Sequence, residues 1–123
     1  MAAKKSRDPL GDLRKLSASF PETAEVVAWG HPTFRAGKKI FASYGEHEGV
    51  PTITVKATLA DQAALTQDAE RFFVPAYVGH QGWIGIYARR VAWPMIEELV
   101  EQSYRYVALK RMINALDESR GKR

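Results

Sequence analysis

The sequence predicts an α+β domain: an antiparallel, twisted sheet with N- and C-terminal helices packed on one of its faces. Three observations lead to this fold class. Apolar residues recur at helical spacing near the N-terminus, a strict apolar and polar alternation marks a strand at Thr52–Lys56, and a long amphipathic stretch follows Pro94. The 123 residues suffice for one hydrophobic core, so we expect a single domain over residues 1–123.

The N-terminal helix is predicted from its start signal and its apolar stripe. Asp8 is a favourable N-cap, and Pro9 takes the first helical position, where its missing N–H costs nothing. The helix is expected to end before Pro21, and residues 22–28 are expected to hold a turn of helix. The apolar stripe consists of Leu10, Leu13, Leu16 and Phe20.

A hairpin is predicted around Gly37. His31 precedes a proline, which favours extended geometry and keeps this arm out of a helix. Gly37 supplies the backbone freedom that a tight reversal requires, so the chain returns as a strand. A loop with an odd number of residues would place Phe34 and Ile40 together on the core face. The opposite face would then receive Arg35, Lys39 and Phe41.

The remaining elements alternate between strand and helix. Thr58 is the expected N-cap of a short helix over residues 59–67. Strands are predicted at Arg71–Val74 and Trp83–Ala88, and one long helix from Pro94 to about Leu116. The core face of the sheet then takes Ile53, Val55, Ile84 and Ile86 in addition to Phe34 and Ile40.

The other sheet face combines bases and aromatic rings. By the same alternation it carries Arg35, Lys39, Phe41, Thr52, Thr54, Lys56, Trp83 and Tyr87. Whether residues 57–81 fold over this face stays open at the level of the sequence. Taken singly, Trp29 and Trp83 are expected to pack against other residues, because most large aromatic side chains are buried.

The net charge of +4 belongs to the two ends of the chain. Residues 1–15 hold five Lys/Arg and two Asp, residues 105–123 hold six Lys/Arg and two acids, and residues 16–104 hold seven Lys/Arg and ten acids. We expect the basic ends 1–7 and 118–123 to be frayed. The absence of cysteine and of any long apolar run predicts a soluble, cytoplasmic protein without disulfides or membrane contact.

Catalytic and metal-binding patterns are missing from the sequence. His31, His47 and His80 fall in predicted loops or arms, and none pairs with another at the spacing of metal ligands on a helix. No nucleophile, phosphate-loop or dinucleotide motif appears. We therefore predict no metal and no cofactor, and we favour a non-catalytic role over an enzymatic one.

Two non-catalytic functions remain open. A basic hairpin with Arg35, Lys38 and Lys39, together with Lys56 on the sheet face, suits contacts with DNA phosphates, and Phe41, Trp83 and Tyr87 could stack on bases. The alternative is a small-ligand or protein-interaction module around an aromatic and histidine patch. Its residues are Trp29, His31, Trp83 and Tyr87. Either module would be a monomer or a weak homodimer.

Several segments resemble one known family along nearly the whole chain. The most specific is Ala28-Trp29-Gly30-His31-Pro32-Thr33-Phe34-Arg35, which is followed by Gly37-Lys38-Lys39-Ile40-Phe41-Ala42. Further matches are Thr54-Val55-Lys56, Pro75-Ala76-Tyr77, Gly82-Trp83-Ile84 and Ser103-Tyr104. Together these segments resemble the MmcQ/YjbR-like proteins.

The resemblance implies a frataxin-like (CyaY-like) sandwich and a "double-wing" role in DNA binding, with hairpins as the wings. It does not imply iron binding for this chain. An acidic iron-binding ridge would need clustered carboxylates on the first helix, where only Asp8 and Asp12 occur among five bases.

Overall fold

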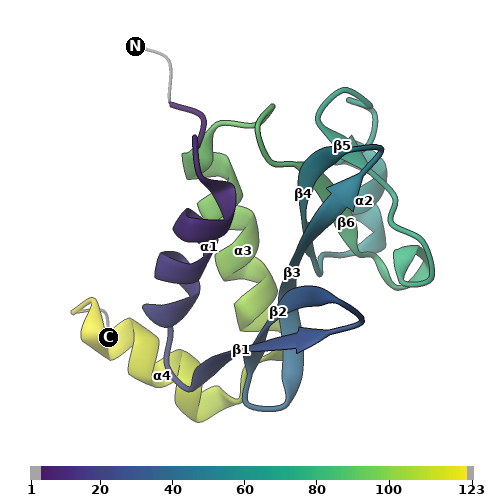
Figure 1. Ribbon diagram of the computed structural model, residues 1–123. Helices are drawn as coiled ribbons and strands as arrows, with labels where there is room; N and C mark the ends of the chain where they lie inside the picture. Colours follow the sequence, from purple (N-terminus) through teal and green to yellow (C-terminus); the bar gives the residue numbers. More distant parts are fainter. Residues whose placement is uncertain (1–3, 122–123) are drawn as a thin grey trace.

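Six antiparallel strands form one sheet in the computed structural model, which describes residues 4–121. The strand order is β1-β2-β3-β4-β6-β5, and helices α1 and α3 lie on one face of this sheet (Figure 1), which confirms the predicted fold class. The strands are β1 (Thr23–Ala28), β2 (His31–Ala36), β3 (Lys39–His47), β4 (Val50–Val55), β5 (Phe72–Phe73) and β6 (Ile84–Tyr87). The helices are α1 (Pro9–Ala18), α2 (Leu59–Leu65), α3 (Trp93–Val107) and α4 (Lys110–Ser119), with a 3-10 turn at Gly79–Gln81.

Three two-residue turns join the first four strands. Gly37 and Lys38 make the predicted reversal between β2 and β3. In the other two turns, Trp29-Gly30 and Glu48-Gly49, both residues have positive φ, as a type I′ hairpin turn requires. Across the Trp29-Gly30 turn, residues 23–28 pair with β2 along their whole length. These residues therefore form a strand and not the expected turn of helix.

The two-residue turn at Gly37-Lys38, followed by a β-bulge in β3, reverses part of the predicted face assignment. Phe34 pairs with Ala42 and Arg35 with Ile40, so Phe41 is an extra residue without a partner in β2. Phe41 lies in the core on the helical side, where its ring meets Phe20 and Tyr104 at centroid distances of 6.0 and 5.4 Å. Ile40 faces the opposite side of the sheet. The predictions for Phe41 and Ile40 were therefore both wrong, because the turn has two residues, Gly37 and Lys38, and not an odd number, so Ile40 pairs with Arg35 and Phe41 falls on the helical side. The bulge then adds Ala42 to the helical side.

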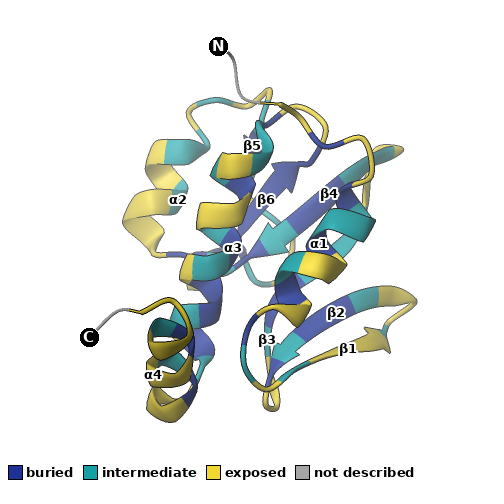
Figure 2. Ribbon diagram, turned by 90° about the vertical axis from the view of Figure 1, so that its left-hand side faces the viewer, coloured by how far each residue is buried: buried dark blue, intermediate teal, exposed yellow. Residues whose placement is uncertain are grey.

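The core lies between the helices and the sheet, as the buried inner strands and inner helix faces in Figure 2 show. Leu13, Ile53, Val55, Ile84 and Ile86 are buried there as predicted. The Asp8 carboxylate accepts a hydrogen bond from the N–H of Gly11 at 3.1 Å, which confirms the expected N-cap. The Oγ1 of Thr58 caps α2 in the same way.

The predicted long C-terminal helix is two helices. Ala108 and Leu109 are extended, with ψ of 150° and 155°, and separate α3 from α4. The change of direction allows Met112 and Leu116 of α4 to be buried in the core. Burial of these two side chains outweighs the helical preference of residues 108 and 109, which contain neither glycine nor proline.

Both basic ends are attached to the domain over part of their length. The carbonyl of Lys4 accepts a hydrogen bond from the N–H of Trp93 at 2.8 Å, and Lys5 forms a β-bridge with Ala92. At the other end, Arg120 makes an ion pair of 2.7 Å with Glu101. The expectation that the ends 1–7 and 118–123 are frayed stays a prediction, and residues 1–3 and 122–123 lie outside the described residues.

Candidate functional site

A cleft of about 380 Å³ opens on the sheet face opposite α1 and α3. Its floor consists of side chains from β2, β3 and β4 that point away from the helices. One wall is the turn between β1 and β2, and the other is the segment between β5 and β6. The floor residues are Thr33, Ile40, Ser43, Thr52 and Thr54, and the walls are Ala28, Trp29 and His31 on one side and Phe73, Pro75, Ala76, Val78 and Trp83 on the other.

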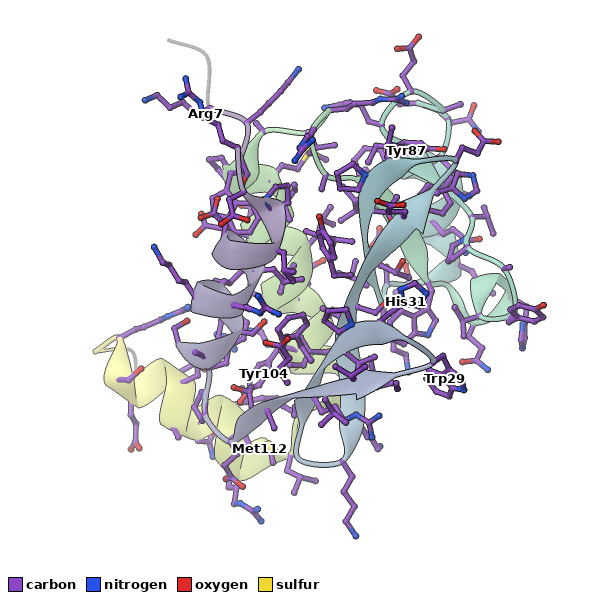
Figure 3. The ribbon with its side chains drawn as sticks, in the orientation of Figure 1. Arg7, Trp29, His31, Tyr87, Tyr104 and Met112 are labelled. Carbon is purple, nitrogen blue, oxygen red and sulfur yellow. The ribbon has the colours of Figure 1, made fainter. Side chains whose placement is uncertain are left out.

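Trp29 stands at the rim of this cleft in an unfavourable backbone conformation. It has φ +53°, which bulky residues rarely adopt, and its side chain is 83% exposed. Figure 3 shows it at the tip of the β1–β2 hairpin, away from the helices. The type I′ turn would favour asparagine at this position. Since an exposed indole recovers little free energy by burial, the expectation that Trp29 packs is wrong.

The opposite wall is fixed by Gln62 of α2. Its Nε2 donates hydrogen bonds of 2.7 Å to the carbonyls of both Gly79 and Trp83, which lie on either side of the 3-10 turn. Gly82, with φ +89°, passes so close to the backbone of Ala57 that an added Cβ would lie 2.8 Å from its oxygen. This close packing holds Trp83, which is half-buried, against the cleft.

Residues 57–81 cover part of the open sheet face. The ring of Phe73 lies on Gly85, where an added Cβ would be 2.2 Å from Cζ. Tyr87 is buried beneath it, at 4.9 Å from the Phe73 ring and 5.9 Å from the His47 ring, and is only 9% exposed. Tyr87 is therefore not available to stack on a ligand in this conformation, in contrast to the predicted patch.

Two histidines, His31 and His47, occupy the end of the cleft. His31 lies against Gly45, where an added Cβ would be 3.4 Å from its Nδ1. His47 stacks on Phe73 with a centroid distance of 4.4 Å. Glu46 is the only Asp or Glu among the lining residues that the structure describes, and none of those residues is Lys or Arg. Glu46 pairs with Pro51 and shares the helical face of β3 with Tyr44, so its carboxylate points away from the cleft.

The four predicted phosphate-contacting bases do not form one surface. Arg35 pairs with Ile40 and so belongs to the cleft face, where its Nε donates to Thr33 Oγ1 at 3.4 Å. Lys39 pairs with the buried Ala36 and belongs to the helical face. Lys38 lies in the turn, and Lys56 follows β4. The two-residue turn puts Arg35 and Lys39 on opposite faces, whereas the expected loop with an odd number of residues had placed them together.

A second hollow, of about 580 Å³, lies on the helical side. Both of its arginines are already engaged in ion pairs: Arg105 pairs with Glu101 and Asp117, and Arg120 pairs with Glu101. Burial opposes the ionisation of Glu101, but hydrogen bonds from Arg120 and Arg105 outweigh it and hold its pKa below the usual value. This hollow is therefore an ion-pair network that joins α3 to α4, and the cleft is the better candidate for a ligand.

Two negative findings concern the described part of the chain. Within residues 4–121, no three His, Asp or Glu side chains are grouped so that they could hold a metal ion. None of the helices in the same range has the length and the apolar character that a bilayer crossing requires.

Sequence reasoning found part of the cleft. Trp29, His31 and Trp83 were predicted, and the structure brings all three to its walls. It missed Ile40, which the two-residue turn places on the cleft face, and Phe73 and His47, which cover Tyr87. It also missed Tyr77, which has φ +66° and is 95% exposed between the lining residues Ala76 and Val78. No sequence signal marks the positive φ of Tyr77.

Comparison with known proteins places these features in a family. The fold is similar to the crystal structure of the Deinococcus radiodurans protein DR2400, described as a DUF419 domain, with a TM-score of 0.73. Sequence identity is 17%, and the match covers 93% of this chain and 88% of that chain. Among curated proteins no match was found. The YjbR family model matches residues 18–106, which contain every strand and the whole cleft, and the chain therefore belongs to the YjbR family.

Proposed function

We propose that this YjbR-family domain is a non-catalytic binding module that holds a small, planar organic molecule in the cleft. The observation that carries the proposal is the state of Trp29, an exposed indole kept at positive φ on the rim of an apolar cleft. Strained residues that fold stability does not explain are concentrated at ligand sites. The volume of about 380 Å³ falls in the range typical of small-molecule sites.

The lining supports a ligand with a flat apolar body and few polar groups. Trp29 and Trp83 face the cleft from opposite walls, and Ile40 supplies an apolar floor. Ser43 and Thr54 add hydroxyls that can donate or accept hydrogen bonds. Aromatic walls with a few polar groups at the floor favour stacking of a ring, oriented by one or two hydrogen bonds.

A fragment screen by protein-observed NMR tests this function. We expect planar aromatic fragments to shift amide signals of the cleft, foremost those of Ser43 and Thr54, and Trp29→Ala to weaken these effects. Val27→Ala is the matched control, because Val27 is 68% exposed on the same hairpin and does not line the cleft. A screen in which no fragment perturbs the cleft, or in which the two variants behave alike, contradicts the proposal.

DNA binding is a second candidate, favoured by one observation. Lys38 and Lys39 are exposed at the tip of the β2–β3 hairpin and make no ion pair within residues 4–121. Fluorescence anisotropy with labelled duplex and single-stranded DNA at two salt concentrations tests it. If the hairpin contacts DNA, a Lys38→Glu, Lys39→Glu variant weakens binding and Lys15→Glu on α1, also exposed, does so less. Equal effects would mean non-specific attraction by a basic protein.

A further inference from the structure

We infer that the ligand of the cleft carries an anionic oxygen group on its planar body, and that Arg35 binds this group beside Thr33 and Ser43. The inference rests on the proposed function and assigns its ligand a chemical class, that of aromatic oxyanions, which a carboxylate represents in the test. Three observations carry it: the place of the Arg35 side chain, the lack of an acidic partner for it within residues 4–121, and the hydroxyls next to it on the floor.

The side chain of Arg35 runs along β2 toward the floor of the cleft. Arg35 is not itself a lining residue, but it pairs with Ile40 and contacts Thr33, which both are. Its Nε donates a hydrogen bond of 3.4 Å to the Oγ1 of Thr33, and this hydroxyl in turn donates at 2.5 Å to the carbonyl of Val26. The proton of the Thr33 hydroxyl is thus engaged, and a lone pair of its oxygen faces the guanidinium. The guanidinium is thereby held beside Thr33, at the end of the floor away from His31.

Arg35 has no carboxylate partner among the residues that the structure describes. Three arginines within residues 4–121 are half-buried, Arg35, Arg71 and Arg105, and the other two are both ion-paired. The Nη groups of Arg35 make no hydrogen bond to another described residue. A half-buried guanidinium has lost part of its hydration, and an oxyanion can replace it with two parallel, charge-assisted hydrogen bonds. An oxyanion of the ligand is therefore the partner that this guanidinium fits.

A row of hydroxyls crosses the floor beside the guanidinium. Thr33 pairs with Ser43, and Ser43 pairs with Thr54, so the three side chains lie next to one another on the cleft face. The hydroxyls of Ser43 and Thr54 can donate to an oxygen of the ligand. Glu46 is the one acidic residue of the described lining, and its carboxylate points away from the cleft. An oxyanion here thus meets a cation and hydroxyl donors, and no carboxylate of the described lining opposes it.

The test compares three probes that share one ring system and differ in charge. Quinoline-4-carboxylate is an anion, quinoline-4-carboxamide has nearly the same shape without the charge, and N-methylquinolinium is a cation. Affinities are measured at pH 8 from the NMR shifts of cleft amides. We expect the carboxylate to bind tightest and the cation weakest, with roughly a 3- to 30-fold preference for the carboxylate over the carboxamide.

Three variants examine the role of Arg35. Arg35→Gln should abolish the preference for the carboxylate over the carboxamide, and continued binding of the carboxamide shows that the cleft is intact. Arg35→Lys keeps the charge but loses the planar fork, so it should retain only part of the preference. Arg89→Gln is the control, because Arg89 is an exposed arginine that makes no ion pair within residues 4–121 and does not line the cleft.

The outcomes separate this inference from the proposed function. Equal binding of the carboxylate and the carboxamide, or tightest binding of the cation, overturns the assignment of charge and leaves the binding module in place. A preference that Arg35→Gln and Arg89→Gln reduce to the same extent overturns the role of Arg35. Should Arg35→Gln not fold, an undiminished preference in Arg35→Lys contradicts binding by the guanidinium. If none of the three probes perturbs the cleft, the inference is wrong, and the proposed function fails with it only when the fragment screen finds no cleft ligand either.

Discussion

The buried hydroxyl of Ser103 in α3 donates a hydrogen bond of 2.5 Å to the carbonyl oxygen of Phe41, the extra residue of the bulge in β3. The Oγ of Ser103 also accepts a hydrogen bond of 2.8 Å from the N–H of Lys56, where the chain leaves β4. One side chain thus pairs two backbone groups that have left the regular ladder of the sheet. This connection links the helical layer to the bulge, which gives both Phe41 and Ala42 to the helical side.

Replacing Ser103 by alanine should destabilise the protein. It leaves the Phe41 carbonyl and the Lys56 N–H without their partner in a buried place, and we expect a loss of roughly 1–3 kcal/mol in the free energy of unfolding. Urea denaturation measures this loss. Ser119→Ala is the control, because Ser119 bonds only the carbonyl of Leu116 at an exposed helix end. A loss no larger than that of Ser119→Ala would show that water or the backbone replaces the hydroxyl.

Replacing Trp29 by asparagine should stabilise the protein while it removes a wall of the cleft. Asparagine tolerates positive φ better than tryptophan does, and the indole, at 83% exposure, contributes little packing. We expect a gain of about 1 kcal/mol in the free energy of unfolding, together with weaker binding of cleft fragments. Thermal and urea denaturation measure the gain. Glu48→Asn, in the other type I′ turn, shows the effect of the backbone alone, and a destabilised Trp29→Asn would assign the indole a role in packing.

Replacing Gln62 by glutamate should loosen residues 79–83, which belong to the wall of the cleft opposite Trp29. A carboxylate has nearly the same shape as the amide but cannot donate to the carbonyls of Gly79 and Trp83, which it would then repel. We expect faster amide hydrogen exchange in residues 79–83 and a loss of roughly 1–3 kcal/mol in stability. Gln67→Glu is the control, because Gln67 lies just after the end of α2 and its side-chain amide makes only a long, 3.4 Å hydrogen bond to the carbonyl of Ala63. Equal exchange rates in the two variants would contradict this role for Gln62.

Ionisation of the Tyr104 hydroxyl should lower the free energy of unfolding at alkaline pH. Burial raises the pKa of this hydroxyl to about 12, and the hydroxyl donates a hydrogen bond of 2.7 Å to the carbonyl of Pro21. Because the unfolded chain loses this proton near pH 10 and the folded protein only near pH 12, the stabilisation is complete below pH 10. It is lost as the pH rises to about 12, by an amount on the order of 2 kcal/mol.

The measurement is the free energy of unfolding between pH 8 and pH 12 for the protein and for Tyr104→Phe. The variant should be less stable at pH 8, by roughly 1 kcal/mol for the lost hydrogen bond, and its stability should fall less steeply with pH. Tyr106→Phe controls for an exposed tyrosine of the same helix. Parallel curves for the protein and Tyr104→Phe would assign the alkaline loss to other groups.

The sequence could predict whatever depends on neighbouring residues. Asp8 and Pro9 specified the start of α1, since capping requires only the first turn of the helix. The alternation in Thr52–Lys56 gave the correct faces to Ile53 and Val55, because β4 is regular and its period is two. Gly37 gave the reversal between β2 and β3. Trp29, His31 and Trp83 could be identified as residues of one patch from their types and their places in arms and loops.

The tertiary structure decided what depends on contacts between distant residues. The bulge in β3, whose Phe41 carbonyl is bonded to Ser103 62 residues away, gives Ala42 as well as Phe41 to the helical side and so turns Ser43 toward the cleft. The C-terminal helix breaks after Val107 because Met112 and Leu116 gain burial against the rest of the core. The cleft exists because Gln62 and Gly82 hold a wall opposite Trp29. Local sequence patterns do not indicate these contacts, since each contact depends on where the folded chain brings its partner.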